Sequence, residues 1–590
     1  MKNWITWILL ALILIASFLI RVLPNYNLIF QPSMVVFNEV DPWYHMRLVD
    51  YMMAHFPSSL LWDQYATLGG ARVGYLPIMA WTVAGLSLLT GIDYNIIGAF
   101  LPPIAACISL FIIFLIGLSL FKSNWVGLGA ALIASILPSQ FLQRSVLGNT
   151  DHHILEALFL FLATLFIIKF SEKYRIIYAV LSGFSITLYF MNWWGSLMML
   201  VPLATWILLT SLKIYFQNQK SLKFHIGILI LLISTFLPLL LIKDSLPDIS
   251  LFLYSFIGLV GMTTLLGLIA YLPKKYYISI LSISFLAVLV LTYNIGLLKN
   301  ILDLSKYALG SFISTIGEAS PMDLYTYFSI YNVAAVLVFP GLYFYTKNRN
   351  SAFFLILTLF LFTLSIFQIR WSYYLILSIA IMCSYFLYWL SQQVTKDFKA
   401  PIYTVAILML LIPSIKGNIQ MVTSPPLLGP AWGQALIWLN INTPQPFSDT
   451  KAYLDTNPGQ PKYTVSSWWD YGHWIIRIGQ RVPLTSPTIQ VIENNSDSQF
   501  FTAQNTTDAK AYLKGLKVKY IMIDEAMVTG KFYAIVVRQG YNIKDVSKWY
   551  EKAMVVQLYK KGVDGYKLVY DNGDVKIFEV LDYEKISSGE

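Results

Sequence analysis

Charged residues and cysteine are both scarce in this chain. Only 12% of its 590 residues are charged, while 57% are hydrophobic. This composition excludes an ordinary soluble globular protein, whose surface needs more charged side chains. The two cysteines, Cys107 and Cys383, both lie in apolar runs, so we expect neither a disulfide nor a thiolate metal site. The sequence therefore predicts a polytopic membrane protein.

The few charges that are present are unbalanced. Lys and Arg number 41 and Asp and Glu number 31, which gives a net charge of +10. In a membrane protein such an excess marks cytoplasmic loops rather than nucleic-acid binding, so we expect no nucleic-acid partner. At the N-terminus, Lys2 precedes an apolar run from Trp4 to Leu23. The run is too long for a cleaved signal peptide and lacks a small-residue cleavage site, which predicts a signal-anchor helix.

Further apolar runs, each near the length that spans a bilayer, follow the N-terminal one. They lie at 98–120, 125–141, 154–170, 176–192, 196–216, 225–242, 250–272, 277–297, 331–346, 352–368, 372–392 and 401–415. One more run, 77–93, is ambiguous because it is short, starts near Pro77 and contains a polar Trp81-Thr82 step and Gly85. Its placement decides which loops share a side of the membrane.

Positive charge resolves the placement of 77–93. If this run lies on the membrane surface and the N-terminus is inside, every inside loop carries Lys or Arg, as cytoplasmic loops do. These residues are Lys122, Lys173, Arg175, Lys220, Lys223, Lys274, Lys275, Lys347, Arg349, Lys396 and Lys399. We therefore predict about 13 transmembrane helices, counting the first, with 77–93 at the interface. Asp41, Asp151 and the loop 298–330 then share the extracytoplasmic side.

The composition changes near Pro425 to polar and β-branched sequence with recurrent Gly, Pro and Asn. We expect a transmembrane catalytic domain over 1–424, with long extracytoplasmic loops at 24–97 and 298–330, and an extracytoplasmic soluble α/β domain over 425–590. Expected helices of the soluble domain are 432–440, 507–515 and 526–538, and expected strands are 518–523, 554–559, 566–570 and 575–580.

Three outside segments carry acidic residues. They are Glu39-Val40-Asp41, Gly148-Asn149-Thr150-Asp151-His152-His153 and Ser314-Thr315-Ile316-Gly317-Glu318. Taken singly, such acids are more often helix caps or solvated loop groups. Together, carboxylates and an imidazole form a ligand set suited to Mg²⁺ or Mn²⁺, ions that neutralise a pyrophosphate leaving group. Asp151 and His153 could reach one ion only through an irregular turn, because residues two apart do not share a helix face.

An aromatic string, Trp468-Trp469-Asp470-Tyr471-Gly472, lies in the predicted soluble domain. Core packing or a membrane-interface belt would explain the tryptophan pair equally well. The whole string is more specific, since it resembles the signature of oligosaccharyltransferase catalytic subunits. The acidic segments are similar to those of the archaeal type of that family. The resemblance implies a GT-C-like membrane glycosyltransferase fold.

The resemblance also implies roles for the acidic residues. Asp41 resembles the first-loop acid of the family, and Asp151-His152-His153 resembles its Asp-x-Asp element in a variant that ends in His. Thr315-Ile316-Gly317-Glu318 resembles its Thr-Ile-x-Glu element. By this resemblance Asp41, Asp151, His153 and Glu318 hold Mg²⁺ or Mn²⁺. Asp41 and Glu318 also hold the acceptor amide, and accepting both of its N–H hydrogens could weaken the amide conjugation that makes the nitrogen a poor nucleophile.

The resemblance also implies residues that bind the two substrates, the lipid-linked donor and the acceptor. Arg370 lies between two spans on the outer side, against the positive-inside trend, and a family arginine there contacts the lipid pyrophosphate. Arg144 either braces the Asp-His-His element or anchors at the interface. The remaining implied residues bind the acceptor Ser or Thr: Trp468, Trp469, Asp470 and Met527.

The resemblance implies one function. A single subunit in the cell membrane would transfer an oligosaccharide from a polyprenyl (di)phosphate to the Asn of N-x-S/T sequons in an acceptor polypeptide. Two alternatives stay open. Another lipid-sugar glycosyltransferase, modifying Ser/Thr or a glycolipid, would not need the Trp-Trp-Asp-Tyr-Gly string. A transporter would bury charges near the bilayer midplane and contain repeats, whereas the acids here cluster in outside loops.

Overall fold

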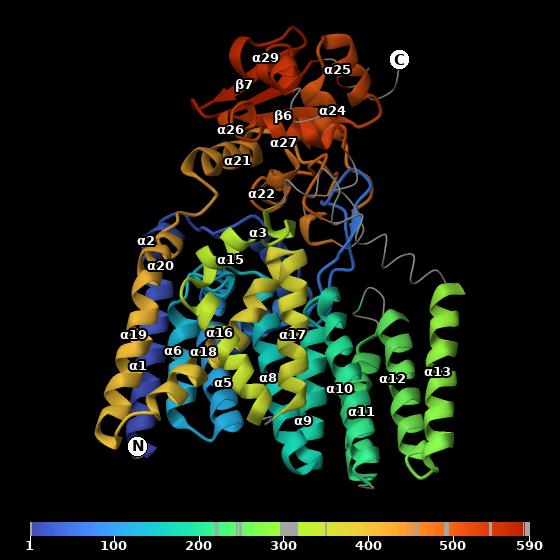
Figure 1. Cartoon of the computed structure of the whole chain (residues 1–590). Coiled ribbons are helices and arrows are strands. Elements are labelled where there is room, and N and C mark those ends of the chain that lie inside the picture. The colour runs from blue at the N-terminus through green and yellow to red at the C-terminus, as the bar shows by residue number, and fades with distance from the viewer. Residues whose placement is uncertain are drawn as a thin grey trace.

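The protein is built from a layer of long helices with a smaller α/β domain on one end of it (Figure 1). The computed structural model describes residues 3–218, 222–243, 246, 250–294, 317–348, 351–449, 452–455, 458–488, 495–541, 546–581 and 583. Thr315, Ile316 and most of the predicted loop 298–330 lie outside the described residues.

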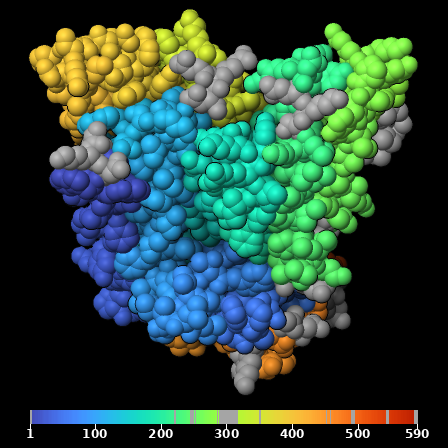
Figure 2. All heavy atoms as spheres, turned by 90° about the horizontal axis from the view of Figure 1, so that it is seen from below, coloured from blue at the N-terminus to red at the C-terminus, as the bar shows by residue number. Residues whose placement is uncertain are grey.

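The helices of the layer correspond to the predicted apolar runs. They are α1 (Asn3–Val22), α5 (Tyr94–Phe121), α6 (Asn124–Ile136), α8 (His152–Lys173), α9 (Ile176–Phe190), α10 (Leu200–Phe216), α11 (Leu222–Leu241), α12 (Ser250–Ile269), α13 (Lys274–Asn294), α16 (Ala334–Asn348), α17 (Ala352–Phe367), α18 (Ser372–Ser391) and α19 (Lys399–Leu411). Seen from the end opposite the α/β domain, the amber chain near residue 400 and the green chain near residue 270 lie at opposite edges (Figure 2).

Length and composition identify a multi-pass membrane protein. Among the described residues, 8 helices are long and apolar enough to cross a membrane, or 9 if α15 (Leu324–Tyr331) and α16, bent by 88°, form one span. Helices α6, α9 and α17 have only 13, 15 and 16 residues. The structure therefore confirms a mainly helical polytopic fold, whereas the total of about 13 spans stays a prediction.

Lipid would cover the outer face of the layer. On α1, the exposed large side chains recur every three or four residues, at Ile8, Leu12, Ile15 and Leu19. This spacing places them on one stripe of the helix. Such a stripe would be unfavourable in water but is suited to hydrocarbon, where no hydrophobic penalty applies.

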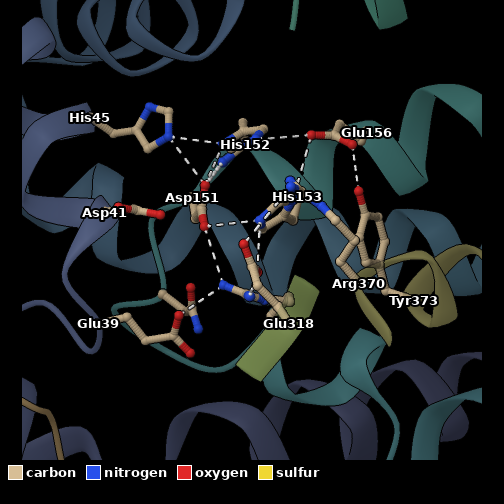
Figure 3. A network of polar contacts seen from close by, with 12 residues as sticks. Glu39, Asp41, His45, Asp151, His152, His153, Glu156, Glu318, Arg370 and Tyr373 are labelled. Carbon is tan, nitrogen blue, oxygen red and sulfur yellow. Dashed lines mark hydrogen bonds and ion pairs between the residues drawn. The ribbon is translucent and has the colours of Figure 1, made fainter. Parts of the chain in front are cut away.

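The chain between α1 and α5 contacts the α/β domain through one of its helices. It contains α3 (Asp41–His55), α4 (Ile78–Thr90) and two short antiparallel strand pairs. The pairs are β1 (Phe30–Gln31) with β2 (Met34–Val35) and β3 (Trp62–Asp63) with β4 (Ala71–Arg72). The ambiguous run 77–93 forms α4, which has 13 residues and packs on α3 and α5. Asp41 and Asp151 lie in one cluster, as a non-spanning 77–93 requires (Figure 3).

The α/β domain has a four-stranded sheet of order β5-β6-β8-β7. Strand β5 is parallel to β6, and the other pairs are antiparallel. The strands are β5 (Thr464–Ser466), β6 (Val518–Asp524), β7 (Tyr566–Asp571) and β8 (Val575–Val580). The helices are α21 (Pro430–Asn442), α22 (Gly472–Arg477), α24 (Ser496–Thr502), α25 (Thr506–Leu513), α26 (Glu525–Val528), α27 (Phe532–Arg538), α28 (Val546–Tyr550) and α29 (Met554–Lys561).

Two secondary-structure predictions in this domain are corrected by the structure. The segment 554–559, expected as a strand because of Val555 and Val556, forms helix α29. Both valines are buried where α29 packs on α24 and β6, and this packing outweighs the small helix penalty of β-branched residues. The expected helix 526–538 is divided into α26 and α27. Gly530, a weak helix former, lies in the break.

Candidate active site

Asp41 and Asp151 each stand at the start of a helix. Asp41 is the first residue of α3, where a carboxylate is favoured by the helix dipole. Asp151 is the N-cap of α8, with extended backbone (φ −125°, ψ 155°), and its carboxylate accepts from the His152 N–H. Just before it, Gly148 has φ +79°, and a side chain there would strike Ile29.

This turn lets the side chains of Asp151 and His153 face the same point. The sequence predicted such an irregular turn if the two residues were to reach one ion. His153 Nε2 lies 3.5 Å from Asp151 Oδ2 and 4.0 Å from Glu318 Oε2. Glu318 is presented by a separate short helix, η4 (Gly317–Ala319). Figure 3 shows Asp41, Asp151, His153 and Glu318 around one centre. The structure thus places Asp151, His153 and Glu318 in contact, with Asp41 facing the same region, although the four do not all lie within 4.8 Å of one another among the described residues.

Arg144 lies inside this acidic cluster. Its Nη1 is 2.8 Å from Glu39 Oε2 and 3.4 Å from Asp151 Oδ2, and its Nη2 donates to Glu318 Oε2. Only 10% of the side chain is exposed, so Arg144 is not an anchor that extends to the membrane interface. Burial opposes its charge, but the surrounding carboxylates raise the pKa of Arg144 above its ordinary value.

The carboxylates of the cluster differ in their access to the surface. Asp151 and His153 are 0% and 2% exposed. Asp41 and Glu318 are 34% and 28% exposed at the side chain. A molecule that approaches the cluster would therefore meet Asp41 and Glu318 first, because Asp151 and His153 lie deeper in the protein.

The electrostatics of the cluster fit a divalent cation. Burial, together with the charges of Asp151 and Glu318, raises the pKa of Asp41 to about 8. Burial also opposes ionisation of Glu318, but Arg144 and Arg370 lower the pKa of Glu318 to about 2. Negative charge is thus crowded at Asp41, where a cation would relieve the repulsion. The donor set of carboxylate oxygens and one imidazole suits Mg²⁺ or Mn²⁺.

Residues that the sequence did not single out complete the cluster. Two groups have possible ligand atoms within 4.8 Å of one another: His45, Asp151 and His152, and His152, His153 and Glu156. His45 Nε2 lies 3.1 Å from both Asp151 Oδ1 and His152 Nδ1. A sequence signal for Glu156 does exist. It is a carboxylate within an apolar run, three and four residues after the histidine pair, and such acids are rare in transmembrane helices.

Arg370 reaches the same cluster beside Glu318. It lies in η5 (Ile369–Trp371), directly before α18. Its Nη1 is 3.9 Å from Glu318 Oε1, and its guanidinium lies over the Trp193 ring at 4.8 Å. With 22% of the side chain exposed, Arg370 presents a cation at the open edge of the cluster.

The aromatic string links strand β5 to helix α22. Trp468 is buried, and Asp470 accepts from Lys531 Nζ at 2.8 Å. The Lys531 ammonium also lies 4.3 Å from the centre of the Tyr471 ring. Met527 is fully buried in α26, so its predicted contact with an acceptor stays a prediction.

Helix α22 connects this string to the acidic cluster. It packs on α3, where His473 Nδ1 lies 3.6 Å from Asp41 Oδ1. One turn later, Arg477 Nε and Nη2 donate to the two carboxylate oxygens of Asp50 at 3.1 Å each. Helix α22 therefore places the end of the string next to the helix that begins at Asp41.

Fold and site define a membrane-embedded enzyme with an acidic centre beneath an α/β domain. A family model described as "Oligosaccharyl transferase STT3, N-terminal" matches residues 9–345, and one described as "AglB core domain" matches residues 430–528. The first match spans more than half of the chain. The chain belongs to the STT3 oligosaccharyl transferase family.

Individual relatives agree with this assignment. The chain is 25% identical to the dolichyl-phosphooligosaccharide-protein glycotransferase 2 of Archaeoglobus fulgidus, over 97% of this chain and 98% of the relative. Its fold matches the archaeal oligosaccharyltransferase AglB from the same organism, solved with an inhibitory peptide and a dolichol-phosphate, with a TM-score of 0.84, 20% identity and coverage of 97% and 80%. A second Archaeoglobus fulgidus oligosaccharyltransferase structure, a complex with Zn and sulfate, matches with a TM-score of 0.75, 22% identity and coverage of 97% and 73%.

Proposed function

We propose that this oligosaccharyltransferase moves an oligosaccharide from a polyprenyl (di)phosphate to the Asn side chain of N-x-S/T sequons. The observation that carries the proposal is the convergence of Asp41, Asp151, His153, Glu318 and Arg370 (Figure 3). The helix that follows the Trp-Trp-Asp-Tyr-Gly string packs on the helix that Asp41 begins. The relative named as a dolichyl-phosphooligosaccharide-protein glycotransferase and the solved relative bound to a peptide and a dolichol-phosphate support the same substrates.

Asp41, Asp151, His153 and Glu318 would hold the divalent cation, Mg²⁺ or Mn²⁺, which when bound neutralises charge on the leaving phosphate. Arg370 binds that phosphate from the open edge, because a guanidinium forms strong charge-assisted hydrogen bonds with phosphate oxygens. The Trp193 ring beneath it limits the motion of the guanidinium. Arg144 braces Asp151 and Glu318 from below.

The acceptor amide lies between Asp41 and Glu318. These are the more exposed carboxylates of the cluster. Each accepts a hydrogen bond from one N–H of the Asn side chain. Orienting the nitrogen in this way brings it to the anomeric carbon without a free bimolecular encounter. Weakened amide conjugation makes its lone pair more available.

The sequon Ser or Thr is bound by Trp468, Trp469 and Asp470, with Met527 against the Thr methyl group. A site built to hydrogen-bond a hydroxyl strongly rejects an analogue that lacks it. In the topology we propose, about 13 spans cross the membrane within 1–424, with the N-terminus inside. The cluster and the α/β domain, 425–590, then face the extracytoplasmic side of the cell membrane, and one subunit suffices.

The test combines purified protein, a lipid-linked oligosaccharide and a fluorescent Asn-x-Thr peptide, with Mn²⁺, Mg²⁺ or EDTA. We expect a glycopeptide with either metal ion and none with EDTA. Matched Gln-x-Thr and Asn-x-Ala peptides should remain unmodified. Transfer to the Gln-x-Thr peptide would indicate modification of Thr and overturn the proposal. Transport of the lipid-linked donor across the membrane without release of its oligosaccharide would also overturn it.

A further inference from the structure

Glu156 is a buried carboxylate in α8, one turn from the helix start, and none of the roles above uses it. It is 0% exposed and lies within a candidate membrane span, where an unpaired carboxylate is costly. Its Oε2 accepts from the hydroxyls of both Tyr373 and Tyr374 on α18. One oxygen of this carboxylate is therefore fixed by two hydrogen bonds from the neighbouring helix.

The second oxygen points toward the histidine pair (Figure 3). Glu156 Oε1 lies 3.2 Å from His152 Nε2 and 3.5 Å from His153 Nδ1. Within the described part of the chain, none of these three buried atoms makes a hydrogen bond of standard geometry. Three polar atoms that converge without a formed hydrogen bond are rare in a buried site, and their closest approach is to one another.

His153 thus stands between two sets of groups. Its Nδ1 faces Glu156, while its Nε2 faces Asp151 Oδ2 and Glu318 Oε2, at 3.5 and 4.0 Å. A neutral imidazole has one N–H donor and one lone pair, and a carboxylate can only accept. Carboxylates therefore face both ring nitrogens at 3.5 Å. A cation on the Nε2 side would take the Nε2 lone pair and leave the N–H on Nδ1, toward Glu156.

We propose that Glu156 is a positioning residue that holds His153 with Nδ1–H toward Oε1 and presents Nε2 to a divalent cation. Tyr373 and Tyr374 keep the carboxylate in place from α18. The inference rests on the proposed metal-dependent function and adds to it the group that sets the orientation of one ligand. A carboxylate behind a histidine ligand also raises the basicity of the ligand.

The experiment measures Mn²⁺ affinity, from the electron paramagnetic resonance signal of free Mn²⁺, on the full-length protein in detergent. The variants are Glu156→Gln, whose amide can donate to Nδ1 and favour the other tautomer, and Tyr373→Phe, which removes one of the two hydrogen bonds to Oε2. The matched control is Thr164→Val. Thr164 is equally buried two turns further along α8, and its hydroxyl donates to the Leu160 carbonyl.

We expect Glu156→Gln to weaken Mn²⁺ binding by about 10- to 100-fold, with a smaller loss for Tyr373→Phe and none for Thr164→Val. Saturating Mn²⁺ should restore the transfer rate of both variants, with the KM for the acceptor peptide unchanged. Replacing a residue that only stabilises the fold would not change the Mn²⁺ dependence while leaving the peptide KM unchanged. If Glu156→Gln does not fold, the Tyr373→Phe measurement decides.

Two results would overturn the role of Glu156 and leave the proposed function intact. One is wild-type Mn²⁺ affinity in Glu156→Gln and Tyr373→Phe. The other is complete loss of binding in Glu156→Gln while Asp151→Ala still binds, since Glu156 would then be a ligand itself. A wild-type protein that binds no Mn²⁺ and transfers in EDTA would instead refute the metal dependence of the proposed function, and the positioning role with it.

Discussion

His473 Nδ1 lies 3.6 Å from Asp41 Oδ1, which joins the helix after the Trp-Trp-Asp-Tyr-Gly string to the first residue of α3. Arg477, four residues later on the same face of α22, pairs with Asp50 on α3. Both approaches lie on one face of α22, and the Arg477–Asp50 pair is the one that forms hydrogen bonds. The spacing between the string and Asp41 thus depends on an interface between two domains.

The Arg477 and Asp50 pair should be coupled in stability and in acceptor binding. Their side chains are 11% and 12% exposed and line a cavity of about 670 Å³. We expect Asp50→Asn or Arg477→Gln alone to cost about 2 kcal/mol of unfolding free energy, less than for a fully buried pair, and to raise the KM for acceptor peptide. The double variant should cost less than the sum of the two. Strictly additive costs, measured by unfolding in detergent, would show that the pair does not act as a unit.

The same pair predicts how stability changes with acidity. Burial opposes ionisation of Asp50, but Arg477 and the Tyr453 hydroxyl outweigh it and hold the pKa of Asp50 below its ordinary value of 3.8. A depressed carboxyl pKa stabilises the folded state above the unfolded pKa, and this stability is lost as the pH falls through the folded pKa. The midpoint temperature of thermal unfolding, measured from pH 6 to pH 3, should therefore fall more steeply below pH 4 in the wild type than in Asp50→Asn. Parallel curves would contradict the assignment.

Asp41 and Glu318 should be essential for transfer but not for membrane insertion. Replacing either by Ala removes one of the two groups that orient the acceptor nitrogen and should lower kcat/KM by at least about 100-fold. Glu172→Gln is the matched control, because Glu172 pairs with Lys122 at the far end of α8 and should keep full activity. Full transfer by Asp41→Ala or Glu318→Ala would exclude these residues from the chemistry.

Arg370 should act on the lipid-linked donor and not on the peptide. Losing one charge-assisted contact to phosphate costs about 1.5–3 kcal/mol, so Arg370→Gln should raise the KM for the donor by about 10-fold or more. The KM for the peptide should stay unchanged. Arg370→Lys keeps the charge but not the bidentate geometry and should be intermediate. An effect confined to the peptide KM would place Arg370 at the acceptor instead.

Residues of the site differed in how much of their role could be predicted from the chain alone. Asp41, Asp151, His153 and Glu318 stand in short local strings, so they could be proposed as site residues before any contact was known. For Glu156 the local sequence shows an acid in an apolar run but not its partner, because Tyr373 is 217 residues away in the sequence. The segment 554–559 was misjudged as a strand for a similar reason: its burial against α24 and β6 leaves no local pattern.

The sequence by itself determined the membrane character, the order of the apolar helices and the family strings, since hydrophobic burial and short motifs are written in composition and local spacing. Tertiary structure alone decided which side chains meet. It joined His473 to Asp41 and aimed Glu156 at His153. Such contacts depend on the packing of distant helices, and a single sequence carries no record of which helix packs against which.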